Sequence, residues 1–153
     1  MLSHTAEHAL RAIVFLAGHS EGSFSTAEIA AQSGIPASYL ATILKDLARA
    51  GLVQSRRGRN GGFRLTRAAS EISVLDVVRV VDQFRRIESC PLGEPAHFIE
   101  MCPLCRHLDG AVALVERVYA ECTVNSLLAQ PAAGGARCRF PQPLPATERR
   151  SAV

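Results

Sequence analysis

Apolar residues recur at intervals of three and four along the first part of the chain, and this spacing predicts helices. The first predicted helix covers about residues 4–19, where the apolar positions are Ala6, Ala9, Leu10, Ile13, Leu16 and Ala17. The stretch "STAEIAAQSGI" follows, and its Ser25 and Glu28 form a capping box that begins a second helix. Gly34 then ends this helix.

The third predicted helix, in "PASYLATILKDLARAG", has one apolar and one polar face. Pro36 suits its first turn, and Gly51 ends it. The apolar stripe comprises Leu40, Ile43, Leu44 and Leu47, and the opposite face presents Ser38, Ala41, Thr42, Lys45 and Arg49. Two short helices joined by a tight glycine turn predict a helix-turn-helix, whose second helix enters the major groove of DNA.

A β-hairpin is predicted directly after the third helix. "LVQS" and "FRLT" have the pattern of two short strands, and "RRGRNGG" between them is typical of a turn. This hairpin would be the wing of a winged helix-turn-helix, with arginines at its tip. An unrelated β-hairpin beside two helices is the alternative. The residues expected to contact DNA are Ser38, Tyr39, Thr42, Lys45, Arg56, Arg57, Arg59 and Gly61.

The second half of the chain predicts a connecting helix, a cysteine-containing loop and a long helix. Ser73 and Asp76 mark the start of the connecting helix, the loop spans about residues 84–104, and the long helix ends near Cys122. One apolar stripe of the long helix comprises Leu108, Ala111, Val112, Val115, Val118, Tyr119 and Cys122. A second subunit and the chain's own first helix would each cover part of this stripe.

The fold class is therefore mainly α with a small β-wing: a winged helix-turn-helix domain followed by a long dimerisation helix. Residues 1–68 form the DNA-binding region, and residues 69–128 contain the linker helix, the cysteine loop and the dimerisation helix. Proline and glycine enrichment predicts that residues 129–153 form a disordered tail, which includes Cys138. Cys122 is expected to be a small core residue.

The net charge of +3 is unevenly distributed along the chain. Residues 38–67 hold seven basic side chains against the single acidic Asp46, a distribution typical of proteins that bind a polyanion such as double-stranded DNA. The apolar run near the start is not expected to be a signal peptide, because Arg11 interrupts it, no basic segment precedes it and no small-residue cleavage site follows it. It is also too short for a membrane span. A cytoplasmic protein without membrane association is expected.

Three of the five cysteines lie close together in the sequence. Cys102 and Cys105 form a C-x-x-C motif, and eleven residues separate them from Cys90. Thiolates bind iron–sulfur clusters and zinc, and two cysteines beside Arg85, Arg86 and Arg106 would also suit a thiol switch. An iron–sulfur cluster is favoured over zinc or a metal-free redox loop. No enzyme is predicted, because a thioredoxin-like reading of C-x-x-C needs a βαβ unit that the pattern lacks.

These motifs together resemble the Rrf2 family of bacterial transcription regulators over residues 1–128. The resemblance rests on "AEHALRA", the helix-turn-helix "STAEIAAQSGIPASYLATILKDLARAGLVQS", the wing "RGRNGGFRLTR", and "ISVLDVV" before the cysteine loop. It implies a dimeric regulator, expected to be a repressor, that senses iron–sulfur status, nitric oxide or redox state. It also implies a [2Fe–2S] or [4Fe–4S] cluster on Cys90, Cys102 and Cys105, completed by Glu7 of the partner subunit or by His107. The uneven cysteine gaps depart from the family's usual spacing.

Overall fold

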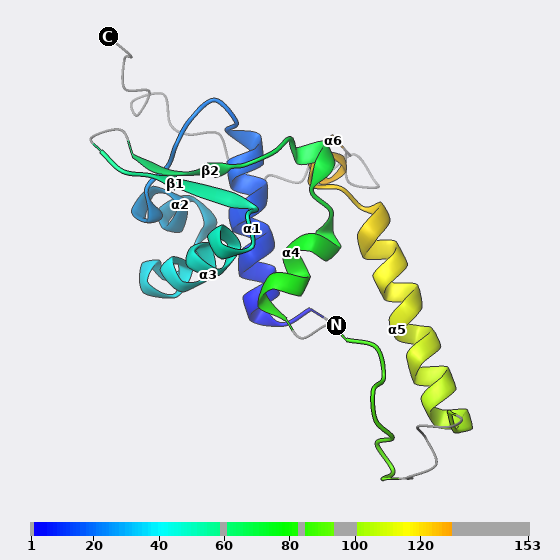
Figure 1. Ribbon diagram of the computed structural model, residues 1–153. Coiled ribbons are helices and arrows are strands. Elements are labelled where there is room, and N and C mark those ends of the chain that lie inside the picture. Colours follow the sequence, from blue (N-terminus) through cyan, green and yellow to red (C-terminus); the bar gives the residue numbers. More distant parts are fainter. Residues whose placement is uncertain (1, 59–60, 83–84, 94–100, 130–153) are drawn as a thin grey trace.

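The computed structural model describes residues 2–58, 61–82, 85–93 and 101–129. It is mainly helical with a small two-stranded antiparallel sheet, as predicted (Figure 1). In chain order the elements are α1 His4–Gly18, α2 Thr26–Ser33, α3 Ala37–Arg49, β1 Val53–Arg56, β2 Gly62–Leu65, the 3₁₀ turn η1 Ala69–Glu71, α4 Val74–Val81, α5 Pro103–Glu121 and α6 Val124–Ala129. The sequence pattern did not predict η1 or α6.

Side-chain caps fix the predicted helix starts. Ser25 accepts a hydrogen bond from the backbone N–H of Glu28, whose carboxylate accepts one from the backbone N–H of Ser25. Ser73 and Asp76 make the same reciprocal pair at the start of α4. Gly34 ends α2 with φ 66°, a left-handed conformation that favours glycine. These three cap predictions are confirmed.

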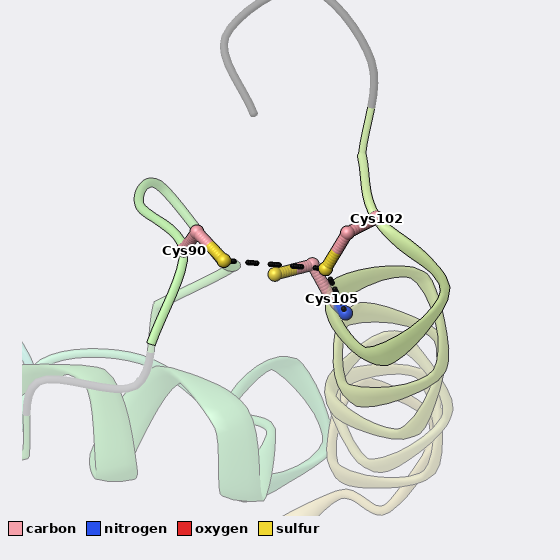
Figure 2. A group of neighbouring side chains, drawn as sticks. All are labelled: Cys90, Cys102 and Cys105. Carbon is pink, nitrogen blue, oxygen red and sulfur yellow. Dashed lines mark hydrogen bonds between the residues drawn. The ribbon is translucent and has the colours of Figure 1, made fainter. Parts of the chain in front are cut away.

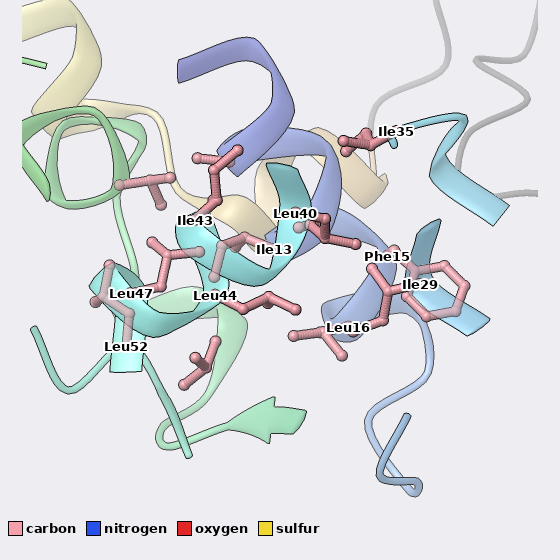
Figure 3. Close-up of a cluster of buried hydrophobic side chains, with 14 of the residues drawn as sticks. Ile13, Phe15, Leu16, Ile29, Ile35, Leu40, Ile43, Leu44, Leu47 and Leu52 are labelled. Carbon is pink, nitrogen blue, oxygen red and sulfur yellow. The ribbon is translucent and has the colours of Figure 1, made fainter. Parts of the chain in front are cut away.

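The helix α1 is the centre of the core. It packs against α2, α3, α4, α6 and β2, and its Ala9, Ala12 and Ile13 are completely buried. The apolar face of α3 meets it through Leu40, Ile43, Leu44 and Leu47, all of them buried as predicted (Figure 3). Pro36 is the residue just before α3 and not part of its first turn. This packing fixes the direction in which the polar face of α3 points.

The wing is a short antiparallel hairpin in which Val53 pairs with Leu65 and Arg56 with Gly62. Phe24 extends it by a bridge to Phe63, with backbone N–H···O distances of 3.0 and 2.7 Å. A Cβ atom added at Gly62 would overlap the backbone of Phe24. Only glycine therefore allows the hairpin to lie this close to the α1–α2 connection.

The helix α5 lies apart from the helix-turn-helix and the wing (Figure 1). The apolar stripe predicted on it divides between two environments. Tyr119 and Cys122 pack against the buried cluster formed by Ala6, Val74 and Val78, so the chain itself covers this part, and Cys122 is only half-buried. The exposed large apolar residues of α5 are Leu104, Leu108, Leu114, Val115 and Val118. Ala111 and Ala120 are exposed as well, and Val112 is half-buried.

Two backbone hydrogen bonds attach the C-terminal end of α5 to the rest of the domain. The N–H of Val74 donates to the carbonyl of Cys122, and the N–H of Val124 donates to the carbonyl of Ile72, each over 2.8 Å. The predicted tail begins at Ala129, which the structure instead places as the last residue of α6. The rest of the tail, residues 130–153 with Cys138, lies outside the described residues. None of the helices described is long and apolar enough to cross a membrane.

Candidate metal centre and DNA-binding face

The polar face of α3 is open to solvent. Ser38, Tyr39, Thr42 and Lys45 are all exposed, because the apolar residues between them are buried against α1. The hydroxyl of Tyr39 lies 2.5 Å from the hydroxyl of Thr5, and its ring contacts the ring of His8 edge-on. The side chain of Tyr39 therefore connects the start of α3 to the first turns of α1, a contact that the sequence pattern did not predict.

The wing hairpin presents basic residues to solvent. Arg56 and Arg57 are exposed, while Arg59 lies outside the described residues. Gly61 has a steric role in the turn, because a Cβ atom there would overlap the carbonyl oxygen of Arg56. Its N–H donates to the carbonyl of Gly58 over 2.9 Å. The wing and α3 thus provide exposed cationic and polar side chains suited to phosphate and base contacts.

The three cysteines singled out from the sequence converge in space. Cys90 lies in the segment 85–93, Cys102 is the N-cap residue of α5, and Cys105 is in the first turn of that helix (Figure 2). Their sulfur atoms all lie within 4.8 Å of one another, and those of Cys90 and Cys102 are 4.0 Å apart. In the part of the chain that the structure describes, no histidine or carboxylate joins this thiol triad.

The local environment of the triad suits metal-bound thiolates. The backbone N–H of Cys105 donates to the sulfur of Cys102 over 3.4 Å, which stabilises negative charge on that sulfur. Burial first, and hydrogen bonds to the neighbouring thiols second, raise the pKa of the Cys105 thiol to about 12. Cys105 is therefore a protonated, unreactive thiol until a metal displaces its proton.

The sulfur spacing is that of a mononuclear thiolate site. Bonds of about 2.3 Å in a tetrahedral arrangement place sulfurs about 3.8 Å apart, close to the distance between Cys90 and Cys102. Three thiolates leave one coordination position for another ligand. The donor set, three soft sulfurs with a backbone N–H donor, is also the set that iron–sulfur clusters use. The spacing thus matches a mononuclear site, whereas the donor types suit either kind of metal group.

The two residues predicted as a fourth ligand lie away from the thiol triad within one chain. Glu7 is in the first turn of α1, where a carboxylate oxygen lies 3.5 Å from the ring of His4. His107 is exposed, and its Nδ1 lies 2.7 Å from the carbonyl oxygen of Pro103. A fourth ligand from this set would have to come from a second copy of the chain or from a turned His107 ring.

Ion pairs beside the triad were not predicted from the sequence. Arg86 donates from Nε to Oδ1 of Asp109 over 2.6 Å and from Nη2 to Oδ2. This hydrogen bonding lowers the pKa of Asp109 and raises that of Arg86. The sequence contained one signal, since Asp109 follows Cys105 by four residues and so lies on the same face of α5. Arg86, expected to act on the thiols, pairs with this carboxylate instead.

Comparison with known proteins identifies the family. A family model described as "Rrf2: Iron-dependent Transcriptional regulator" matches residues 2–130. The chain belongs to the Rrf2 family. A relative from Rhodobacter capsulatus, an HTH-type transcriptional regulator termed rrf2-like, is 34% identical over 79% of this chain and 80% of its own length. Protein aau3 of Rhizobium meliloti is 36% identical over 83% of this chain and 84% of its own.

Solved structures of this family have the same fold. IscR of T. potens matches with a TM-score of 0.69 and 26% identity, covering 84% of this chain and 85% of that one. CymR, the global cysteine regulator of B. subtilis, matches with a TM-score of 0.68 and 27% identity, covering 83% and 95%. The family and its structural relatives are transcription regulators and not enzymes, which confirms the predicted winged-helix fold and regulatory class.

The raised pKa of Cys105 predicts a pH-dependent metal affinity. Because each thiol must lose its proton to bind a metal, Co²⁺ should bind the reduced, metal-free protein more tightly as the pH rises. Between about pH 6 and pH 8 the affinity should increase about tenfold per pH unit for each thiol proton released. Titrations followed by thiolate–Co²⁺ absorption would measure this. A Cys105→Ser variant should show a shallower dependence, and a pH-independent wild type would contradict the prediction.

Proposed function

We propose that this protein is a cytoplasmic, homodimeric repressor whose DNA binding is controlled by an iron–sulfur cluster on the thiol triad. The observation that supports this most strongly is the convergence of Cys90, Cys102 and Cys105 at one end of α5 in a winged-helix protein. The bound group would supply sensitivity to iron supply, nitric oxide or oxidants. The described thiols would hold it, and Glu7 of the partner subunit or His107 would complete the ligand set.

A contiguous series of contacts runs from the triad to the DNA-binding face. Cys102 and Cys105 begin α5, and α5 packs against α4. The helix α4 packs in turn against α1, and α1 reaches α3 through the hydroxyls of Thr5 and Tyr39. A change in how the triad holds the start of α5 would therefore alter the support of Tyr39, which we propose contacts DNA together with Ser38, Thr42, Lys45 and the wing arginines.

A metal-free thiol switch or a zinc site is the second candidate, and one distance favours it. The sulfurs of Cys90 and Cys102 lie 4.0 Å apart, close enough for a disulfide after a small movement. A structure titled as the oxidized form of CymR from Staphylococcus aureus matches this chain with a TM-score of 0.65 and 27% identity. In the metal-free switch the buried Cys105 would remain a thiol, whereas zinc would bind it as a thiolate.

The exposed stripe of α5 supports the dimer. Leu104, Leu108, Ala111, Val115 and Val118 follow one another at steps of four and three and are all exposed. This is the spacing of a coiled-coil seam. A second copy of α5, related by a two-fold axis, would cover the stripe with the same residues.

Replacing single cysteines tests the metal group. In anaerobically purified protein, Cys90→Ser, Cys102→Ser or Cys105→Ser should each abolish visible absorption and strongly deplete iron and sulfide, because the thiolates act as one ligand set. Cys122→Ser is the matched control and should leave all three unchanged. Colourless wild-type protein with one zinc per chain would contradict the cluster, as would DNA binding governed by a Cys90–Cys102 disulfide.

Replacing basic residues tests the DNA-binding face. Arg57→Ala should weaken binding to operator DNA and lower the slope of log affinity against log salt by about 0.9, the effect of one lost phosphate contact. Arg117→Ala removes an exposed arginine from α5 and should change neither quantity. Fluorescence anisotropy over a salt series would measure both. An unchanged slope for Arg57→Ala would remove this residue from the interface.

Introducing charge into the exposed stripe tests the dimer. Val115→Glu would place two carboxylates opposite each other in an apolar seam and should shift the protein from dimer to monomer. Arg117→Glu, an exposed position outside the stripe, should leave the dimer intact. Sedimentation velocity would distinguish the two species. Wild-type protein that remains monomeric at high concentration would refute this assignment of α5.

A further inference from the structure

Two arginines bind two carboxylates along the face of α5 that carries the thiols. Asp109 accepts hydrogen bonds from Arg86 at both of its oxygens, and Oδ1 also accepts one from the backbone N–H of Ile87 over 3.2 Å. Glu116 accepts one from Nη2 of Arg79 over 2.8 Å, and Nη1 of Arg86 lies 3.9 Å from its second oxygen. We call the four charged side chains Arg79, Arg86, Asp109 and Glu116 the clamp.

The clamp and the triad form one antiparallel series. Asp109 lies one turn beyond Cys105 on the same face of α5, and Glu116 lies two turns further along it. On the opposite side, the chain runs from Arg79 through Arg86 to Cys90. Arg79 therefore pairs with Glu116, Arg86 pairs with Asp109, and Cys90 meets Cys102. The segment 85–93 lies alongside the first turns of α5 (Figure 1), and the contacts of Arg86 and Ile87 with Asp109 connect the two.

The two carboxylates of the clamp need their arginine partners because they have little contact with solvent. Only 13% of the Asp109 side chain and 17% of the Glu116 side chain are exposed to solvent. A carboxylate with this little solvation requires hydrogen-bond donors, because a largely buried charge without a partner is strongly unfavourable. The fork of Arg86 matches both oxygens of Asp109, an arrangement that fixes direction as well as distance. The contact is thus directional, although about half of the Arg86 side chain is exposed to solvent.

Different parts of the chain hold the three cysteines in position. Cys102 and Cys105 are positioned by α5 itself, as its N-cap residue and in its first turn. Cys90 belongs to a separate segment, with eleven residues between it and Cys102, and follows Arg86 by four positions. The contact between Arg86 and α5 therefore lies close enough in the sequence to bring the third thiol beside the other two.

We propose that the clamp is the positioning device that holds Cys90 in the triad, with Arg86 and Asp109 as its principal pair. This deepens the proposed function, since it assumes that the triad is the sensing site. The clamp residues would act through Cys90 and touch no metal themselves. Loss of either partner would leave the C-x-x-C motif intact and remove the third thiolate, so that a bound metal would have two cysteine ligands in place of three.

The test uses the reduced, metal-free, full-length protein and two readouts. Thiolate–Co²⁺ absorption reports how many cysteines bind the ion, and bridging by dibromobimane, mapped by mass spectrometry, reports whether Cys90 lies beside Cys102 or Cys105. Arg86→Ala and Asp109→Ala should each lower the Co²⁺ affinity about tenfold or more. Each should also reduce the absorption per ion to that of two thiolates and decrease bridging from Cys90 severalfold.

Matched variants separate positioning from general damage. Glu121→Ala removes an exposed carboxylate from the same helix and should behave as wild type in both readouts. Arg86→Lys keeps the charge without the fork and should give intermediate Co²⁺ affinity. The double variant Arg86→Ala/Asp109→Ala should be no weaker than the worse single variant, because both changes remove one contact. Circular dichroism and thermal unfolding of the metal-free protein check that each variant is folded.

Three results would overturn the proposal: wild-type Co²⁺ affinity and Cys90 bridging in both alanine variants, a loss confined to Asp109→Ala, or additive losses in the double variant. If Asp109→Ala does not fold, Arg86→Ala decides alone, since half of the Arg86 side chain is exposed and Arg86 is not part of the buried core. Failure of the proposed function is distinguishable, because protein purified without iron and sulfide would still report on the clamp through Co²⁺ and bridging.

Discussion

The close packing of α1 is the contact on which the rest of the structure depends. Ala6, Ala9 and Ala12 are completely buried, and side chains this small let neighbouring helices approach closely. Through this helix the helix-turn-helix, the wing and α4 share one core. The helix α1 supports α3 on one side and α4 on another, and α4 in turn packs against α5. The DNA-binding face and the part of the chain that carries the cysteines, α5 with the segment 85–93, therefore cannot shift independently of each other.

Most of the DNA-binding half could be predicted from the sequence, because its signals are local. Capping pairs such as Ser25 with Glu28 lie three residues apart, and the faces of α3 follow from helical spacing alone. The short elements η1 and α6 escaped prediction, since a helix of three or six residues carries too little periodicity. A divided covering of the α5 stripe was expected, but the sequence could not show which residues face the chain's own core, because the surroundings of the adjacent apolar residues Val118 and Tyr119 depend on where α4 packs.

The candidate site was predictable in composition but not in geometry. Residue type and spacing singled out Cys90, Cys102 and Cys105, yet the sequence could not show that the sulfurs meet across eleven intervening residues. That meeting depends on pairs such as Arg86 with Asp109, which are 23 positions apart. Two charged residues this far apart in the sequence show no regular spacing from which their pairing could be predicted. The relatives IscR and CymR share this scaffold, so the fold alone does not decide which chemistry the thiols perform.

The order of the contacts along α5 also has a consequence for chain entropy. Arg79 and Glu116 are 37 positions apart, Arg86 and Asp109 are 23 apart, and Cys90 and Cys102 are 12 apart, so each contact encloses the next. The entropy lost on closing a loop grows with the logarithm of its length. Once the outer pairs have formed, bringing the thiols together costs little further chain entropy. The ion pairs thereby raise the effective concentration of Cys90 at the other two sulfurs before any metal arrives.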